Sequence, residues 1–258
     1  MVINDTASVK KQYRNSDNLN TRISIHDKYS VNKQGFGNWI TDHYEIKEGM
    51  TVLELGCGTG SMWAGKGELI RKCGRLILSD FSEGMLTKTR ATLRDYEGVT
   101  YQIIDIQNIP YEDDTFDIVI ANMMLYHVPD LKRGLNEVRR VLKPGGKFYC
   151  ATFGENGIME YLSGLFASYG VKGEANRAFT LQNGAEKLGV AFAKIERFEY
   201  PDALEVTDLE DLADYVYSLS GWSGMREIPR ETLLGVLRAN AVNGVLRVPK
   251  EYGMFIAE

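Results

Sequence analysis

The feature that most constrains the fold is a short apolar run that leads directly into a glycine-rich turn, Val52-Leu53-Glu54-Leu55-Gly56-Cys57-Gly58-Thr59-Gly60. Glycines let the backbone turn sharply and let a ligand lie against bare peptide amides. In open α/β sheets such a turn follows the first strand, and ligands bind at the carboxyl end of that strand. The segment therefore predicts a binding site for a nucleotide-like ligand at residues 52–60.

The spacing of these glycines departs from the dinucleotide pattern G-x-G-x-x-G. Ser61 stands where the third glycine of that pattern would be, and Glu54 places a carboxylate two residues before the first glycine. That carboxylate repels a pyrophosphate but attracts a ligand that carries an ammonium group and a sulfonium. The loop amides can hold the carboxylate of such a ligand.

Short apolar runs alternate with longer amphipathic runs along the chain. We expect strands at 51–55, 75–79, 99–104, 116–121, 147–152 and 194–200, and helices at 62–72, 83–96, 130–142 and 181–192. Strands that alternate with helices imply right-handed crossovers and a parallel sheet with helices on both faces. The sequence therefore predicts an α/β, doubly wound domain. A further amphipathic helix at 158–166 is an insertion, which we expect to cover a binding crevice.

Two glycines interrupt the first expected helix. Gly65 and Gly67 lie inside residues 62–72, and each costs a helix interior roughly 1 kcal/mol relative to alanine. We therefore expect this helix to begin late, near Gly67.

Composition supports a globular chain with a sizeable core. Of the 258 residues 44% are hydrophobic, and 30 Lys plus Arg against 35 Asp plus Glu give a net charge of −5. This balance supplies no broad basic surface for nucleic acid or an anionic membrane, and the apolar runs fall short of the roughly 20 residues that span a bilayer. The polar N-terminus lacks the apolar stretch of a signal peptide, and the three cysteines match no metal or redox spacing. We therefore expect a cytoplasmic protein with reduced thiols.

Acidic residues follow the next two expected strands. Asp80 closes the second strand about 20 residues after the glycines, where a carboxylate can accept hydrogen bonds from both ribose hydroxyls of a nucleoside. Asp105 closes the third strand, and Asn122 closes the fourth. Together with the Glu54-Leu55-Gly56-Cys57-Gly58-Thr59-Gly60 loop, these residues resemble the class I S-adenosylmethionine (SAM) dependent methyltransferases, of the small-molecule type found in ubiquinone and menaquinone biosynthesis.

The resemblance implies SAM as cofactor, bound mainly by the loop and the ends of the next three strands. The implied binding residues are Glu54, Gly56, Cys57, Gly58 and Gly60 in the loop, Asp80, Phe81 and Met85 after the second strand, Asp105 and Ile106 after the third, Asn122 after the fourth, and Tyr29 and Ser30 of an N-terminal arm. Other interpretations stay open. Asp80 could cap the helix that follows, although Ser82 suits that position better, and Asp105 could be a solvated strand end.

The resemblance also implies a Rossmann-like, seven-stranded sheet, mostly parallel, with an antiparallel last strand at 254–257. The whole chain 1–258 is then one methyltransferase domain, with an N-terminal helical arm at 1–45 and a SAM-binding core at 46–153. Segments 155–178 and about 204–242 would form a cap on the acceptor side, where Tyr29, Phe36, Trp39 and the aromatic residues of 215–222 either contact ligands or pack the core.

Candidates for proton transfer follow the fourth strand. We expect His127 as a general base and Tyr126 as a hydroxyl that orients the acceptor, with His26 as a third candidate. The alternative, that His127 is a structural imidazole at the start of the next helix, stays open. The reaction is then in-line transfer of the SAM methyl group to a nitrogen, oxygen or carbon of a small molecule, giving S-adenosylhomocysteine (SAH).

The sequence also bears on other classes of function. The residues after the fourth strand, Ala121-Asn122-Met123-Met124-Leu125, lack the Asn-Pro-Pro-Tyr motif of enzymes that methylate DNA amino groups, so we expect no DNA partner. We also expect no metal and no membrane partner, and the oligomeric state is open. A SAM-binding module without catalysis and an NAD-dependent oxidoreductase are the alternatives, and Ser61 argues against the second.

Overall fold

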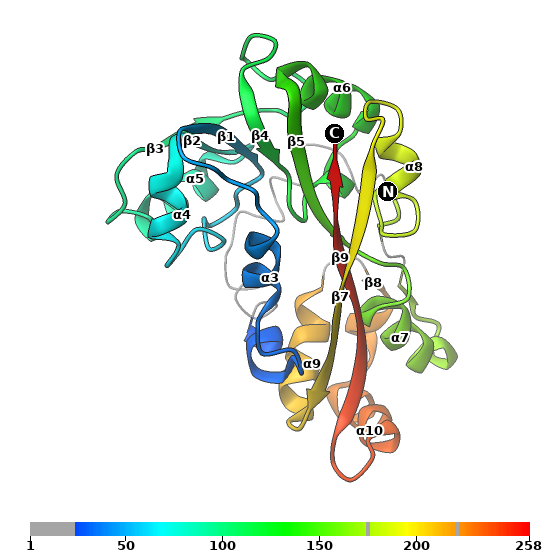
Figure 1. Ribbon diagram of the computed structural model, residues 1–258. Coiled ribbons are helices and arrows are strands. Elements are labelled where there is room, and N and C mark those ends of the chain that lie inside the picture. Colours follow the sequence, from blue (N-terminus) through cyan, green and yellow to red (C-terminus); the bar gives the residue numbers. More distant parts are fainter. Residues whose placement is uncertain (1–23, 174–175, 220–221) are drawn as a thin grey trace.

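The computed structural model of the chain describes residues 24–173, 176–219 and 222–258 (Figure 1). Residues 24–29 are helical and are called the arm helix below. The other helices are α3 (Phe36–Asp42), α4 (Gly67–Lys72), α5 (Glu83–Thr92), α6 (Leu131–Val141), α7 (Ile158–Leu165), α8 (Gly184–Leu188), α9 (Leu209–Ser218) and α10 (Arg230–Asn240), with 3-10 turns η1 (Leu125–His127), η2 (Ala167–Tyr169) and η3 (Met225–Glu227). The strands are β1 (Met50–Leu55), β2 (Cys73–Asp80), β3 (Val99–Ile103), β4 (Phe116–Ile120), β5 (Leu142–Phe153), β6 (Lys172–Gly173), β7 (Ile195–Val206), β8 (Trp222–Ser223) and β9 (Leu246–Ala257).

The main sheet has seven strands in the order β3-β2-β1-β4-β5-β9-β7. Neighbours from β3 to β5 pair in parallel, whereas β9 is antiparallel to both β5 and β7. The order reverses between β1 and β4, and open α/β sheets bind their ligands at the carboxyl ends of strands at such a point. The predicted Rossmann-like, doubly wound fold with an antiparallel last strand is confirmed.

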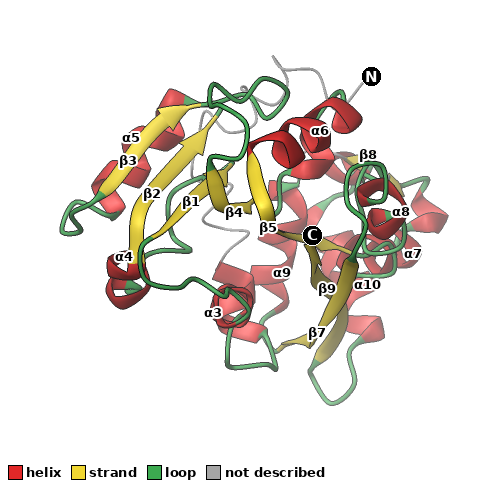
Figure 2. Ribbon diagram, turned by 45° about the horizontal axis from the view of Figure 1, so that its top comes forward, coloured by secondary structure: helices red, strands yellow, loops and turns green. Residues whose placement is uncertain are grey.

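Two apolar clusters cover the two faces of the sheet. On one face α3, α4 and α5 pack through Ile40, Ile70 and Leu86. On the other face α6 and α8 pack through Leu135 and Leu188. Figure 2 shows α6 on the opposite side of the sheet from α3 and α4. Because both faces are covered, the central strands are apolar along nearly their whole length.

β7 and β9 extend well beyond the parallel part of the sheet. Each has twelve residues, and they remain paired from Ile195 opposite Ala257 to Val206 opposite Leu246. The sequence pattern predicted much shorter strands at 194–200 and 254–257. Apolar side chains on the far halves of the two strands pack with α7, α9, α10 and the arm helix into a third cluster, here called the lobe. The lobe lies at the lower end of the molecule in Figure 1.

The chain between the glycine-rich turn and α4 is not helical. α4 begins at Gly67, and Gly65 has a φ of +76°, a value that residues with a side chain rarely adopt. The late start predicted from the two glycines is confirmed.

Candidate functional site

The glycine-rich turn lies where β1, β2 and β4 end side by side. Gly56, Gly58 and Gly60 have φ values of +73°, +58° and +75°. A Cβ on Gly56 would lie 2.9 Å from Met124 Cγ, and one on Gly60 would lie 2.7 Å from Thr89 Cγ2. A Cβ on Gly58 would meet no atom within 4 Å, so open space borders the turn at this residue. Gly56 and Gly60 are therefore needed for packing, and Gly58 leaves room for a ligand.

Glu54 points away from solvent into the cluster under the turn. It is 2% exposed, and Trp63 Nε1 donates a 2.6 Å hydrogen bond to its Oε2. Burial raises the pKa of Glu54 to about 7, although the bond from Trp63 acts in the opposite direction. By accepting this hydrogen bond, Glu54 holds Trp63 in place, and with it the segment that follows the glycine-rich turn. The neighbouring Cys57 is also buried, and burial raises the pKa of its thiol.

Asp80 connects the glycine-rich turn to α5. Its Oδ2 accepts a 3.0 Å hydrogen bond from Gly58 N, and its Oδ1 accepts a 2.8 Å bond from Ser82 N. Ser82 occupies the N-cap position of α5, yet its side chain makes no capping hydrogen bond there. Burial raises the pKa of Asp80, while the amide bonds act in the opposite direction. Each carboxylate oxygen has a second lone pair, so both can accept further bonds from a ligand.

The implied SAM-binding residues Phe81, Met85, Asp105 and Ile106 lie on the β2 and β3 side of the turn. Asp105 accepts hydrogen bonds from the backbone and side chain of Gln107, and it is partly exposed. Ile106 and Met85 have buried side chains, whereas Phe81, directly after Asp80, is partly exposed. Asp105 thus presents a carboxylate beside apolar residues.

Asn122 is held inside the protein after β4. Its Nδ2 donates a 2.6 Å hydrogen bond to Tyr44 Oη, and its Oδ1 accepts a 3.1 Å bond from Ala151 N. The next residue, Met123, has a φ of +54°, which is rare for a residue with a side chain. Asn122 therefore holds β4 against β5 while the backbone turns sharply at Met123 towards the glycine-rich turn.

Tyr126 and His127 follow in η1. Their ring centroids are 4.5 Å apart, and Tyr126 also lies 4.8 Å from Phe153 at the end of β5. Burial lowers the pKa of His127 to about 4, so its imidazole is neutral at neutral pH. The two catalytic candidates therefore lie together, at the carboxyl edge of the sheet.

Tyr29 and Ser30 contact the lobe and the β7–β9 ribbon. The Tyr29 hydroxyl donates to Asp211 of α9 at 2.5 Å, and burial together with this bond raises the Tyr29 pKa to about 12. Ser30 Oγ accepts a 2.9 Å bond from Lys250 Nζ, and Ser30 bridges to Leu204. The structure thus gives both residues partners distant from the glycine-rich turn. The part of the expected arm at 1–23 lies outside the described residues.

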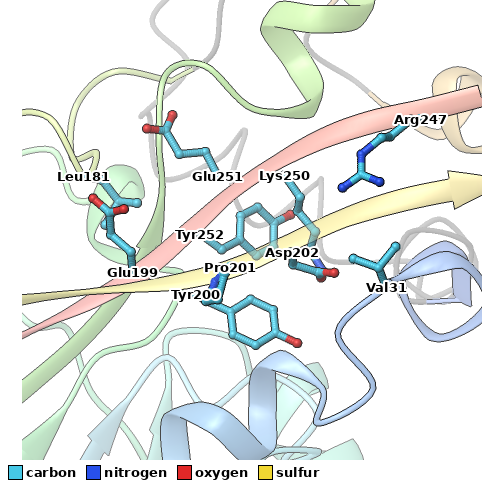
Figure 3. A pocket seen from close by; sticks show the side chains of 10 residues that line it. All are labelled: Val31, Leu181, Glu199, Tyr200, Pro201, Asp202, Arg247, Lys250, Glu251 and Tyr252. Atoms are coloured by element: carbon cyan, nitrogen blue, oxygen red, sulfur yellow. The ribbon is translucent and has the colours of Figure 1, made fainter.

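The Lys250 ammonium forms a buried ion pair that sequence analysis missed. It pairs with Asp202 directly across the ribbon, and the side chains are 2% and 0% exposed. Figure 3 shows this pair beside Tyr200 and Tyr252, at a hollow of about 440 Å³. The available signal was a lysine at an inward-facing position of an alternating strand. Trp63 and Tyr44, which hold Glu54 and Asn122, were also missed, because their partners are known only from the fold.

The residues that form this site also match a known protein family. A family model described as a methyltransferase domain matches residues 53–150. Those residues contain the glycine-rich turn, Asp80, Asp105 and Asn122. They are a class I SAM-dependent methyltransferase domain. The cofactor of this domain is SAM, as the sequence resemblance implied.

Relatives extend the comparison in sequence and in fold. The ubiquinone/menaquinone biosynthesis C-methyltransferase UbiE of Escherichia coli O1:K1 is 34% identical to this chain over 127 residues, 48% of this chain and 50% of UbiE. The chain therefore spans about half the length of the curated relatives it matches. A chain of the complex between the Haloferax volcanii Trm112 methyltransferase activator and a methyltransferase superposes with a TM-score of 0.61, at 21% identity, over 97% of this chain and 96% of that one.

A further solved structure, the trans-methyltransferase CalH in complex with SAH, superposes with a TM-score of 0.53 at 19% identity, over 86% of this chain and 55% of that one. At these identities the structural likeness shows the fold alone.

The residues of the methyltransferase domain fit SAM. The open space at Gly58 admits a ligand against the turn, and Asp80 can accept from ribose hydroxyls beside it. Asp105 offers a second carboxylate acceptor one strand further along the edge. Within the described residues no cluster of three His, Cys, Asp or Glu side chains could hold a metal ion, and none of the described helices has the length and apolar character to cross a membrane.

Proposed function

We propose that this chain transfers the methyl group of SAM to a small-molecule acceptor and releases SAH. The observation that carries the proposal is the Asp80 carboxylate, which bonds the amides of Gly58 and Ser82 beside the open space at Gly58. This arrangement supports a nucleoside ligand at the turn, because a preorganised carboxylate binds two vicinal hydroxyls with charge-assisted hydrogen bonds.

SAM supplies a methyl group on a cationic sulfur, which an acceptor lone pair displaces in line. The chain holds the two reactants at reacting distance and keeps water out of the cleft. Within this proposal Asp80 and Asp105 bind the nucleoside, and Gly58 admits it. Glu54 acts through Trp63 by fixing the turn, and Asn122 fixes the end of β4.

His127 and Tyr126 are the candidates that face the acceptor. A neutral imidazole can accept a hydrogen bond or a proton, but a pKa of about 4 makes His127 a weak base. The low pKa therefore favours a role in orienting the acceptor, with proton removal left to the acceptor itself or to water. The lobe and the arm helix would form the acceptor side of the cleft, as the sequence resemblance implied for segments 155–178 and 204–242.

The first experiment is calorimetric titration of the full chain with SAM, SAH and NAD. We expect micromolar binding of SAM and SAH and none of NAD. Asp80→Ala and Asp105→Ala should each weaken SAH binding by about tenfold or more, because each removes a charged acceptor. Absence of SAM and SAH binding by folded protein would overturn the proposal.

A measurement of turnover distinguishes an enzyme from a module that binds SAM without catalysis. Labelled SAM incubated with a mixture of small metabolites should transfer its methyl group to a small molecule. Binding without transfer to any acceptor would favour the module. The acceptor is the only partner in this proposal, without DNA or membrane, and the three thiols, unpaired in the structure, favour a reducing compartment such as the cytoplasm.

A further inference from the structure

A tight turn directly after β3 carries Asp105. Asn108 N donates a 2.9 Å hydrogen bond to Asp105 O, and this bond closes the turn over Ile106 and Gln107. Asp105 therefore lies at the carboxyl edge of the sheet, beside the end of β2 that carries Asp80. β3 is the edge strand of the described sheet, so the turn needs support from another element.

Helix α6 supplies this support. The buried side chain of Ile106 packs against Gly134 of α6, where a Cβ would lie 3.3 Å from Ile106 Cγ1. Gln107 Oε1 accepts a 3.1 Å hydrogen bond from Asp130 N, at the N-cap of the same helix. The turn is therefore fixed to the beginning of α6 by an apolar contact and by a hydrogen bond.

The side chain of Gln107 also reaches back to Asp105. Gln107 Nε2 lies 3.0 Å from Asp105 Oδ1 and 3.2 Å from Asp105 Oδ2, and Gln107 N donates a 2.9 Å bond to Oδ1. The amide of Gln107 thus bridges the carboxylate and the helix N-cap. Only one orientation of this amide satisfies both neighbours, because the carboxylate needs a donor and Asp130 N needs an acceptor.

These bonds make the two carboxylate oxygens of Asp105 unequal. Oδ1 accepts from both the backbone and the side chain of Gln107, whereas Oδ2 accepts the longer of the two bonds from Nε2. Oδ2 therefore keeps more capacity to accept a bond from a ligand. A carboxylate held at both oxygens cannot rotate without losing these bonds, so its direction is set before a ligand arrives.

We propose that Gln107 is a positioning residue, which orients Asp105 Oδ2 towards the 6-amino group of the cofactor's adenine and thereby sets the preference for a 6-amino over a 6-oxo purine. This inference rests on the proposed function, in which Asp105 binds the nucleoside. A 6-amino group donates to the carboxylate, whereas a 6-oxo group brings a second acceptor against it.

The fixed direction of the carboxylate is what makes this preference strong. A 6-oxo purine carries an N–H at N1, next to its oxygen. A carboxylate that can rotate could turn to this N–H and so tolerate the wrong base. The bonds from Gln107 to both oxygens of Asp105 oppose that rotation, and a 6-oxo purine then leaves the carboxylate facing an acceptor.

Two ligands that differ at position 6 of the purine test this inference. SAH carries the amino group, and its deaminated analogue S-inosylhomocysteine carries an oxo group. Each is titrated calorimetrically into the full chain. We expect the wild-type protein to bind SAH at least about tenfold more tightly than the analogue, because a site built around a specific hydrogen bond rejects a ligand that cannot make it.

Variants assign the preference to Gln107. Gln107→Met removes both hydrogen bonds of the side chain, so SAH affinity should fall about fivefold while analogue affinity changes less than about twofold. Gln107→Glu keeps an acceptor for Asp130 N but places a like charge beside Asp105, and it should lower SAH affinity at least as far. Gln102→Met is the matched control. Gln102 is a partly exposed glutamine of β3 whose Oε1 accepts a bond from Tyr111, and its replacement should leave the ratio of the two affinities unchanged.

The outcomes distinguish this inference from the proposed function. Equal binding of both ligands by wild-type protein, or a wild-type ratio in folded Gln107→Met, would overturn the inference and leave methyl transfer standing. An equal fall in both affinities in Gln107→Met would assign Gln107 to the fold of the turn alone. Wild-type SAH affinity in Gln107→Glu would show that the bond to α6, and not the donor to Asp105, is what matters. Wild-type protein that fails to bind SAH would overturn the proposed function itself.

Discussion

Trp63 Nε1 and Glu54 Oε2 are joined by a 2.6 Å hydrogen bond inside the protein, with both side chains at most 2% exposed. The bond connects the end of strand β1 to the non-helical segment between the glycine-rich turn and α4. Because burial raises the pKa of Glu54 to about 7, the carboxyl group takes up a proton in the folded state at a pH where it is ionised in the unfolded state.

This shift makes stability depend on pH in a defined direction. A folded-state pKa above the unfolded value of 4.5 gives stability that is present below pH 4.5 and is lost as the pH rises through 7. Replacement Glu54→Gln should remove that dependence. We expect the difference in free energy of unfolding between wild type and Glu54→Gln to shrink by about 3 kcal/mol from pH 4 to pH 8, measured by urea denaturation. A constant difference over this range would contradict the shift.

Alanine substitutions at three glycines with positive φ should distinguish a loss of ligand affinity from a loss of stability caused by backbone strain. Gly58→Ala adds a Cβ into the open space beside the turn, so SAH affinity should fall by about tenfold or more, while stability falls by about 1 kcal/mol from strain. Gly60→Ala should destabilise more strongly, because its Cβ would lie 2.7 Å from Thr89 Cγ2.

Gly49→Ala is the matched control for these variants. Gly49 has a φ of +81° and equally open surroundings, but it precedes β1 at the opposite edge of the sheet. It should show the strain of Gly58→Ala with unchanged SAH binding. Calorimetry and thermal denaturation give both readouts, and equal SAH affinity for Gly58→Ala and Gly49→Ala would rule out ligand contact at Gly58.

The losses in free energy of unfolding caused by substituting Lys250 and Asp202, which form a buried ion pair, should be non-additive. Lys250→Met leaves the Asp202 carboxylate buried without its cation, and we expect a loss of about 3–5 kcal/mol in the free energy of unfolding. Asp202→Asn in the same chain removes the unpaired charge while keeping an acceptor for Asn32 N. The double variant should therefore recover most of the loss. Urea denaturation of both single variants and the double variant forms the cycle, and strictly additive losses would show that the two charges do not interact.

His127 should titrate well below an exposed histidine. A folded-state pKa of about 4, below the usual 6.5, means that stability is present above pH 6.5 and is lost as the pH falls through 4. The free energy of unfolding should decrease by up to about 3 kcal/mol over this interval because of His127, and His127→Phe should remove that part. Urea denaturation at pH 7 and pH 4 tests this. An imidazole NMR titration of His127 with a midpoint near 6.5 would contradict it.

The places of Asp80, Asp105 and Asn122 could be predicted from sequence because each lies at or just after the end of a strand. In a parallel sheet the carboxyl ends of adjacent strands meet at one edge. Asp80 therefore lies near Gly58, although 22 residues separate them. The doubly wound fold follows from the same alternation of strands and helices.

The partners of the arm residues Tyr29 and Ser30 could not be predicted in the same way because these contacts are long-range. Tyr29 bonds Asp211 and Ser30 bonds Lys250, each about 200 residues away, and no spacing rule indicates such pairs. The full length of β7 and β9 was missed because Pro201 and Pro249 interrupt the apolar pattern. The structure shows these two strands paired through both prolines.

The unbroken pairing of β7 with β9 limits how far the lobe can move relative to the rest of the sheet. The same two strands contribute side chains to the clusters on the sheet and to the lobe, so the lobe is fastened to the sheet by continuous hydrogen-bonded backbone and not by a loop. Domain closure in many proteins uses a few loop residues as a hinge. Here a swing of the lobe would have to twist the whole ribbon, so we expect the lobe and the sheet to move as one unit.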